Sequence, residues 1–252
     1  MASPSATRSP RERRRHRVRT LVGGLAQTLL TAGVVVLLFV VHQLWVTGLS
    51  AAREQGRLAE ELRGGWPADA PVAGGPTPPA APGVGEPFAV LHVPRLGADW
   101  SRVVLEGTGE EQLARGPGHY VGTAMPGEPG NVAIAGHRVG RGAPFLDLDA
   151  LRPGDAVVVE VADGWFPYRV LADGPDRNGV PGRRVVAPDR VDVVAPVPGG
   201  PADAAPAGSY LTLTTCHPRY SARERLVVHA VLDGPGVARA DAPGGPPALA
   251  QD

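Results

Sequence analysis

A single cysteine, Cys216, is the side chain of this protein best suited to covalent chemistry. It is the only cysteine among 252 residues and closes the alternating run LTLTTC. A cysteine attacks as the thiolate, so a nearby base or cation must make it reactive, and a donor must stabilise the oxyanion that the attack creates. The partners to look for are therefore a histidine and an arginine that the fold brings to this sulfur.

Five of the seven histidines could reach an active site in a folded domain. His16 and His42 precede or lie within a hydrophobic N-terminal segment, so they are excluded. The histidines that remain are His92, His119, His137, His217 and His229.

Position along the chain separates these five histidines. His137 follows the strand-like run NVAIAG, in which Gly136 should end the strand and put the next side chain at the rim of the fold. His217 adjoins Cys216, but neighbouring residues of a strand point to opposite faces. His229 lies inside the alternating run LVVHAV, where a hydrogen-bonded histidine of the sheet is an equally good interpretation. His137 is therefore the favoured partner.

An arginine follows the cysteine at a useful spacing. If YLTLTTC (210–216) and RLVVHAV (225–231) are adjacent antiparallel strands, Arg225 lies beside Cys216. Its guanidinium stays charged and presents a fixed fork of donors, which suits an oxyanion. Arg219 and Arg223 in the intervening turn are rivals on spacing alone, and an arginine at a strand edge is also commonly a solvated surface residue.

The elements that must position these side chains are short and rich in β-forming residues. They are FAVLHV, VVLEG, NVAIAG, AVVVEV, WFPYRVL, VDVVAPV, YLTLTT and LVVHAV, separated by turn sequences such as RPGD and ADGW. This rhythm predicts a mostly β, largely antiparallel sandwich or barrel. Residues 109–116 and 145–151 could each form one or two helical turns. There is no glycine-rich phosphate loop and no CxxC pair, so a nucleotide-binding or zinc-finger protein has no support.

The N-terminal segment predicts a membrane anchor. Residues 21–41 carry no charge, and a stretch of this length is about what a helix needs to cross a bilayer. We therefore expect a retained transmembrane helix over residues 21–46. Arginines crowd the residues before it and mixed charges follow it. The positive-inside rule then predicts a single-pass protein of the cell membrane with its N-terminus in the cytoplasm and its folded domain outside. The formal net charge of zero argues against a nucleic-acid-binding protein.

Composition divides the chain into five parts. A Pro/Gly/Ala-rich stretch precedes the β-rich region, and the residues after it are poor in large apolar side chains. The predicted parts are a basic tail (1–20), the transmembrane helix (21–46), a stalk and linker (47–85), a catalytic domain (86–234) and a disordered tail (235–252).

Several motifs together closely resemble a membrane-bound sortase. These are TLTTC with Arg225, GPGHYVGTAMPGEPGNVAIAGHR (116–138) and GAPFLDLDALRPGD (142–155), together with the anchor and linker. The resemblance covers about residues 87–233 and is greatest for class E, the actinobacterial class. It implies an eight-stranded sortase β-barrel with short helices. It matches Cys216 to the family nucleophile, His137 to the family histidine and Arg225 to the family arginine.

The resemblance also implies a reaction and its partners. A sortase is a cysteine transpeptidase that cleaves a Thr-Gly bond in an LAxTG- or LPxTG-like sorting signal of a secreted protein. It then joins that protein to an amine of a lipid-linked peptidoglycan precursor, and it needs no cofactor. Class E implies alanine at the second position of the signal. The loop 197–209, which looks longer and richer in proline than expected, borders the presumed substrate groove.

Two further residues are candidates for substrate binding. Tyr120 of GPGHY could accept a hydrogen bond from the backbone N–H of that alanine, which proline lacks, although a tyrosine after a turn is also commonly a packed rim aromatic. Thr215 could position the substrate threonine or could serve only as a strand former, whereas Thr214 is better interpreted as a strand former.

Three other functions compete with wall anchoring. One is a sortase that polymerises pilin subunits, with a protein lysine as the acceptor. Another is a non-catalytic, tethered β-barrel that binds wall polymer and holds Cys216 as a buried thiol. The weakest is a zinc site made by Cys216, His217 and His229, for which the sequence supplies no second shell.

Overall fold

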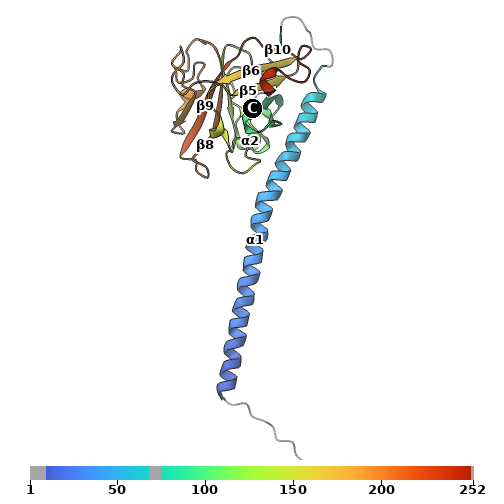
Figure 1. The fold of residues 1–252 in the computed structure, drawn as a ribbon, viewed down its shortest axis with the longest axis vertical. Coiled ribbons are helices and arrows are strands. Elements are labelled where there is room, and N and C mark those ends of the chain that lie inside the picture. The colour runs from blue at the N-terminus through green and yellow to red at the C-terminus, as the bar shows by residue number, and fades with distance from the viewer. Residues whose placement is uncertain (1–9, 68–74, 251–252) are drawn as a thin grey trace, which may run out of the picture. The chain divides into compact units, whose positions relative to one another are not determined.

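The computed structural model describes residues 10–67 and 75–250, and it divides the chain into two compact units, residues 1–47 and 48–252. Helix α1 (Pro10–Gly64) contributes to both units. Within the second unit, eight of the ten described strands form a closed ring in the order β6-β5-β1-β2-β3-β4-β8-β9, and β9 pairs back to β6 (Figure 1). The predicted eight-stranded barrel is confirmed.

The strands of this ring are short, as the apolar runs predicted. They are β1 (Pro87–His92), β2 (Ser101–Glu106), β3 (Gly118–His119), β4 (Gly130–Ala135), β5 (Ala156–Val161), β6 (Gly164–Val170), β8 (Ser209–His217) and β9 (Glu224–Leu232). Outside the ring, β7 (Arg183–Val186) pairs with β9 and β10 (Val237–Ala238) pairs with β6. Most pairs are antiparallel, but β4 and β8 run parallel, as do β2 and β3.

Short helices connect the strands. They are α2 (Glu110–Arg115), η1 (Pro94–Leu96), η2 (Leu148–Ala150), η3 (Val191–Val194) and η4 (Pro247–Ala250). The sequence predicted helical turns where α2 and η2 lie. It also predicted a strand over VDVVAPV, and this is wrong: the run begins with η3 and leaves the sheet, because Pro196 and Pro198 cannot donate to a strand ladder.

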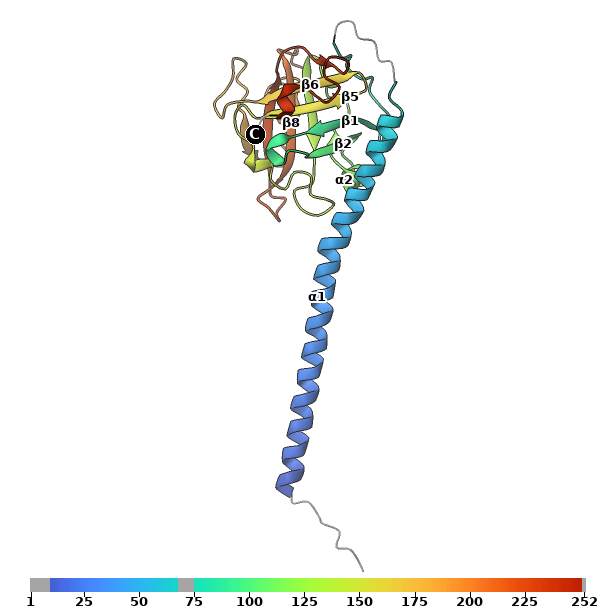
Figure 2. The same cartoon turned by 45° about the vertical axis from the view of Figure 1, so that its right-hand side comes forward.

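The C-terminal part of α1, from residue 48 to residue 64, packs against the barrel. Leu58 and Leu62, one helical turn apart, are buried against Val90 of β1 and Val103 and Leu105 of β2. Figure 2 shows this end of α1 beside these two strands. The sequence predicted a polar stalk here, outside the folded domain that was expected to begin at residue 86. That boundary is wrong because the two leucines dock this helix together with Gln55, which accepts from the Val103 N–H at 2.7 Å and donates to the Arg115 carbonyl at 2.8 Å.

Residues 237–250 also belong to the folded unit. Ala248 packs with Ala156, Val158 and Trp165 on the outside of β5 and β6, and the Trp165 indole N–H donates to the carbonyl of Ala242 at 3.1 Å. The predicted disorder after residue 234 is therefore wrong for this stretch. A few apolar side chains, Val237, Ala248 and Leu249, and one added strand pair are enough to cover this sheet face.

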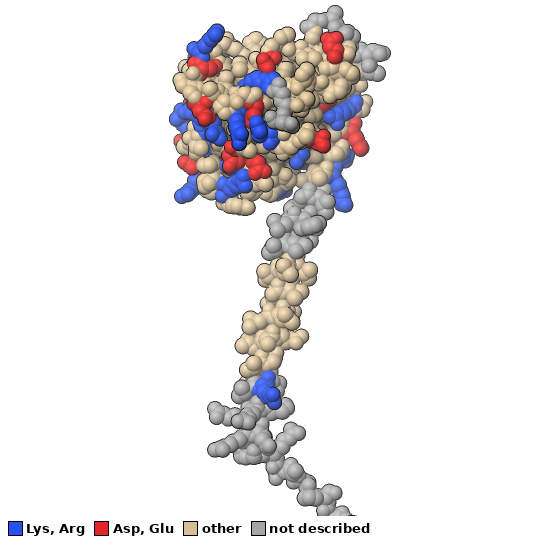
Figure 3. Space-filling view, viewed as in Figure 1, with Lys and Arg blue, Asp and Glu red and all other residues tan. Residues whose placement is uncertain are grey.

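The first unit contains one helical segment that is long and apolar enough to cross a membrane. It is Leu21–Phe39, with a mean hydropathy of 2.1. Figure 3 shows no charged side chain along it. The segment begins at the predicted residue and ends before the predicted residue 46; the side chains of residues 40–49 lie outside the described part.

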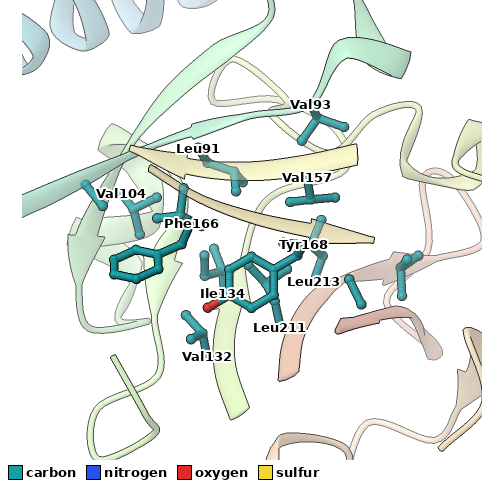
Figure 4. Packing of buried hydrophobic residues seen from close by; sticks show 14 of the residues in the cluster. Leu91, Val93, Val104, Val132, Ile134, Val157, Phe166, Tyr168, Leu211 and Leu213 are labelled. Atoms are coloured by element: carbon teal, nitrogen blue, oxygen red, sulfur yellow. The ribbon is translucent and has the colours of Figure 1, made fainter. Parts of the chain in front are cut away.

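The barrel interior is filled by alternate residues of each strand, as a side-chain period of two requires. Val132 and Ile134 of β4 and Leu211 and Leu213 of β8 point inward, together with Tyr168 of β6 (Figure 4). The intervening residues of β4 and β8 therefore lie on the outer face of the sheet. This alternation decides which side chains can meet a substrate.

Candidate active site

Cys216 and Arg225 are direct partners in the antiparallel pair of β8 and β9. Side chains directly opposite each other in such a pair project from the same face. Leu213 and Leu226 face the barrel interior, so Cys216 and Arg225, which have the other parity, lie on the outer face. The predicted proximity of thiol and guanidinium is matched by this register.

His137 comes to the same place from the other side of β8. The parallel pair of β4 and β8 ends with Ala135 opposite Thr214. The pairing continues one residue further, because the Gly136 N–H donates to the Thr214 carbonyl at 3.0 Å. Extending the register by two residues sets His137 beside Cys216, on the outer face. Cys216 is therefore flanked by Arg225 on β9 and, on its other side, by the segment just after β4 that carries His137.

Position 136, just after the end of β4, requires glycine. A side chain there would begin 2.5 Å from a ring carbon of Phe145, which is buried in the core. The Phe145 N–H in turn donates to the carbonyl of His137 at 3.1 Å. The core aromatic therefore fixes the backbone of the histidine at the end of β4.

The environment of His137 favours the neutral imidazole. Partial burial lowers its pKa below the ordinary 6.5, and the charge of Arg141 lowers it further, against a smaller opposing effect of Glu110. A neutral ring at neutral pH can accept a proton from a thiol or an amine. This is the state that the first proton transfer of a Cys-His pair requires when the thiol starts protonated.

Arg225 is held by the turn that precedes it. Its Nη1 donates to the carbonyls of Ala222 and Glu224, both at 3.1 Å. These bonds hold Nη1 of the guanidinium and leave Nε and Nη2 to donate to a ligand. Arg219 is committed elsewhere, since it pairs with Asp147 at 2.7 Å and Asp149 at 3.4 Å. Of the three arginines considered from spacing, Arg225 is the one whose register puts it opposite the sulfur.

Arg138 is a site residue that sequence reasoning missed. Its side chain is only 2 % exposed, and it pairs with Asp149 at 2.9 Å. Nη1 also lies 3.0 Å from His217 Nδ1 and 3.4 Å from the Cys216 carbonyl oxygen. Arg138 thus ties the end of β8 to the end of β4. The available signal was its place directly after His137, in the motif GHR.

Tyr120 and Thr214 meet on the outer face near Cys216. The Tyr120 hydroxyl and the Thr214 hydroxyl oxygen are 3.1 Å apart. Thr215 instead faces inward, is 3 % exposed, and donates to the Gly136 carbonyl at 2.8 Å. The substrate-binding role predicted for Thr215 does not fit this position. Thr214, which the sequence analysis interpreted as a strand former, lies on the face where Tyr120 and Cys216 are.

The other histidines whose side chains the structure describes have structural partners. His92 lies 2.9 Å from Glu160, and buried His119 lies 2.7 Å from Glu106. His229 is paired with Thr212, four residues before Cys216 along β8. At about 3.3 Å per residue these two sites are too far apart to share one ion, so the zinc set of Cys216, His217 and His229 does not converge.

A cavity of about 760 Å³ opens beside the outer face of β4. It is lined by residues between 122 and 131 and between 191 and 206, among them Gly200, Pro201, Ala202 and Pro206 of the proline-rich loop noted in the sequence. Asn131 fixes its wall, because Nδ2 donates to the carbonyls of Ala195 at 3.0 Å and Val193 at 3.3 Å. The segment that leads into the loop 197–209 is therefore attached to β4, the strand that His137 follows.

Comparison with known proteins decides the family. A model of the sortase domain matches residues 91–233. The chain belongs to the sortase family. This sortase is 36 % identical over 211 residues to sortase SrtE1 of Streptomyces coelicolor, which covers 81 % of this chain and 55 % of SrtE1. It is 35 % identical over 217 residues to sortase SrtE2 of the same organism, which covers 84 % of this chain and 81 % of SrtE2. The chain thus spans about half the length of SrtE1.

Solved structures agree with this placement. Sortase E from Streptomyces avermitilis is 42 % identical, has a TM-score of 0.55, and matches 66 % of this chain and 98 % of its own. SrtF from Corynebacterium diphtheriae is 35 % identical, has a TM-score of 0.64, and matches 72 % of this chain and 100 % of its own. The predicted resemblance to class E sortases, a class of cysteine transpeptidases, is confirmed.

Proposed function

We propose that this sortase is a membrane-anchored cysteine transpeptidase of the cell surface. It cleaves the Thr-Gly bond of an LAxTG- or LPxTG-like signal. It then joins the carbonyl group of the threonine to an amine of a lipid-linked peptidoglycan precursor. One observation carries the proposal: Cys216 is the register partner of Arg225 on β9, and His137 follows the end of β4, the strand that pairs with β8 on its other side. Base, nucleophile and oxyanion donor then share one face, as acyl transfer requires.

The first half-reaction makes a thioester. Neutral His137 takes the proton of the Cys216 thiol, and the sulfur bonds to the carbonyl carbon of the substrate threonine. The carbonyl oxygen becomes an oxyanion, which Arg225 stabilises. When the intermediate collapses, the C–N bond to glycine breaks and His137 returns its proton to the departing amine.

The second half-reaction releases the enzyme. The acceptor amine bonds to the thioester carbon, and His137 takes a proton from its nitrogen. Arg225 stabilises the second oxyanion until the C–S bond breaks and the thiolate of Cys216 regains a proton from His137. The net result is exchange of one amide for another, so no oxidant, reductant or cofactor is consumed.

The sorting signal runs along the outer face of β4 and β8 toward Cys216. There Tyr120 lies next to Thr214, whose hydroxyl oxygen can accept the phenol proton. The phenol oxygen then accepts the N–H of an alanine at the second position of the signal, which proline cannot offer. The loop 197–209 forms the outer wall of this path.

Trapping the thioester tests the reaction. Full-length protein in detergent, incubated with an LAxTG peptide, should gain the mass of the acyl fragment on the peptide that contains Cys216. Cys216→Ala should lose both adduct and cleavage while keeping its melting temperature. Cleavage product from the Ala variant would contradict the proposal.

The orientation has its own test. Arginines gather before Leu21, so the N-terminus stays in the cytoplasm and the barrel is outside. Protease added to intact protoplasts should digest the barrel and spare an N-terminal tag. A protected barrel would overturn the orientation.

A further inference from the structure

A second cavity lies between the end of α1 and the barrel, away from Cys216. Its volume is about 290 Å³, and residues 51–63 of α1 form one wall while β1 and β2 form another. Four arginines line it: Arg63, Arg102, Arg115 and Arg141. None of the described residues that line it is acidic.

Two of these arginines already pair with carboxylates just outside the cavity. Arg63 pairs with buried Glu160 at 2.9 Å, and Arg115 pairs with Glu54 at 2.9 Å. Each carboxylate is shared with a second arginine, Glu160 with Arg239 and Glu54 with Arg57. These two lining arginines are therefore engaged in ion pairs, although their charge is only partly balanced.

Arg102 is different, because no carboxylate among the described residues pairs with it. It is partly buried, its guanidinium lies 5.1 Å from the centre of the Trp100 ring, and Nη1 donates to the Ser101 carbonyl at 2.7 Å. Burial lowers its pKa. A cation removed from water without a counter-ion is unfavourable, and an anion bound beside it would relieve that cost.

Arg141 is nearly as free. Among the described residues its one ion pair is with Glu110 at 3.7 Å, and the Glu110 side chain is 91 % exposed, so water screens the pair strongly. The following residue, Gly142, has φ +76°, and a side chain there would begin 2.8 Å from Ala51 of α1. The loop that carries Arg141 therefore lies directly against the helix wall.

We propose that this cavity binds the phosphate group of an anionic membrane lipid between Arg102 and Arg141. Planar guanidinium groups bind phosphate oxygens through paired N–H donors, and two of them bracket one such group. Small residues of α1, Ala52, Gly56 and Ala59, leave room for it.

The chain keeps this cavity near a membrane surface. This step depends on Leu21–Phe39 crossing the bilayer, as in the proposed function. Only about a dozen residues separate that segment from Ala51, and even fully extended they reach about 40 Å. Lipid headgroups are thus among the most concentrated phosphates within reach.

Binding of a phosphate in this cavity should change the pKa of the catalytic histidine. The charge of Arg141 is one of the causes that lower the pKa of His137. A phosphate beside Arg141 offsets that charge, so the pKa of His137 rises when the site is filled. A packing role for Arg102 and Arg141 would not produce this coupling.

Calorimetric titration of full-length protein in neutral maltoside micelles with sn-glycerol 3-phosphate tests the site directly. Wild type should bind one equivalent saturably, and Arg102→Gln and Arg141→Gln should each bind at least about tenfold more weakly, since each removes charge-assisted hydrogen bonds. Arg53→Gln is the matched control, because Arg53 is exposed on the same helix and does not line the cavity. No saturable binding, or an equal loss in Arg53→Gln, would overturn the proposal.

Two further experiments distinguish a loss of binding from a loss of fold, and a lipid phosphate from a soluble one. Arg102→Lys keeps the charge, so it should restore part of the affinity, and melting temperatures identify any variant that has lost its fold. In nanodiscs, phosphatidylglycerol should compete with glycerol phosphate more than an equal charge of cholesteryl hemisuccinate does. Equal competition would reject the lipid source and assign the site to soluble phosphates. Cys216→Ala should bind as wild type, so failure of transpeptidation and failure of this site are distinguishable.

Discussion

Cys216 and Arg225 are register partners on β8 and β9, and the turn between these strands holds the arginine through the carbonyls of Ala222 and Glu224. The position of the guanidinium thus depends on backbone contacts of its own turn. Its distance from the sulfur is set by the strand pair, with no need for a separate positioning side chain.

Arg225→Lys should lower kcat by about 10²-fold or more, the usual effect of losing one oxyanion donor. A lysine keeps the charge but loses the fork that spans two carbonyls and an oxyanion. Arg219→Gln is the control, because Arg219 pairs with Asp147 and Asp149 instead. Steady-state cleavage of a fluorogenic signal peptide measures both, and a larger loss in Arg219→Gln would move the oxyanion role to that residue.

The stability of the barrel should fall in acid through His229. Burial lowers the pKa of this histidine to about 4. Its Nδ1–H donates to Thr212, whose own proton goes to Asn131, and Nε2 has no partner among the described residues. The unfolded chain gains a proton below pH 6.5, but the folded chain does so only near pH 4.

Stability is therefore lost between these two values as pH falls, by up to about 3 kcal/mol from this group. Urea unfolding at pH 7 and pH 4.5 measures the change. His229→Gln cannot titrate, so its stability should fall less over the same interval. An identical fall in both proteins would assign the acid sensitivity to other groups.

Tyr120→Val should reduce turnover of an LAxTG peptide more than that of an LPxTG peptide. The variant loses the phenol oxygen that accepts the alanine N–H, a difference of about 1–3 kcal/mol in transition-state binding. Parallel kcat/KM measurements on the two peptides give the ratio. Equal losses would leave Tyr120 as the packing partner of Thr214 and turn attention to the loop 197–209.

Much of the barrel could be predicted from alternation in the sequence, because a strand with one buried face repeats every two residues. The same alternation could have placed Thr215, since it has the parity of Leu211 and Leu213, which fill the core. The contact of Arg138 with His217 could not be predicted, because the two residues are 79 positions apart and meet only when β4 and β8 pair.

The errors at the two ends of the domain have one cause. Composition measures how much apolar surface a segment carries, whereas docking depends on what the sheet leaves uncovered. Leu58 and Leu62 bury an outer face of β1 and β2, and Ala248 covers Trp165. Which outer sheet faces are left uncovered cannot be predicted until the strand order is known.

The parallel pairing of β4 with β8 also has a consequence during synthesis. Thr215 and Gly136, whose hydrogen bond joins the two strand ends, are 79 residues apart. Such long-range pairs form late, because a large loop must close first. His137 and Cys216 therefore come together only after both strands have been synthesised and β4 has paired with β8. The proposed site is assembled at the end of folding, and no part of the chain that precedes β8 contains it.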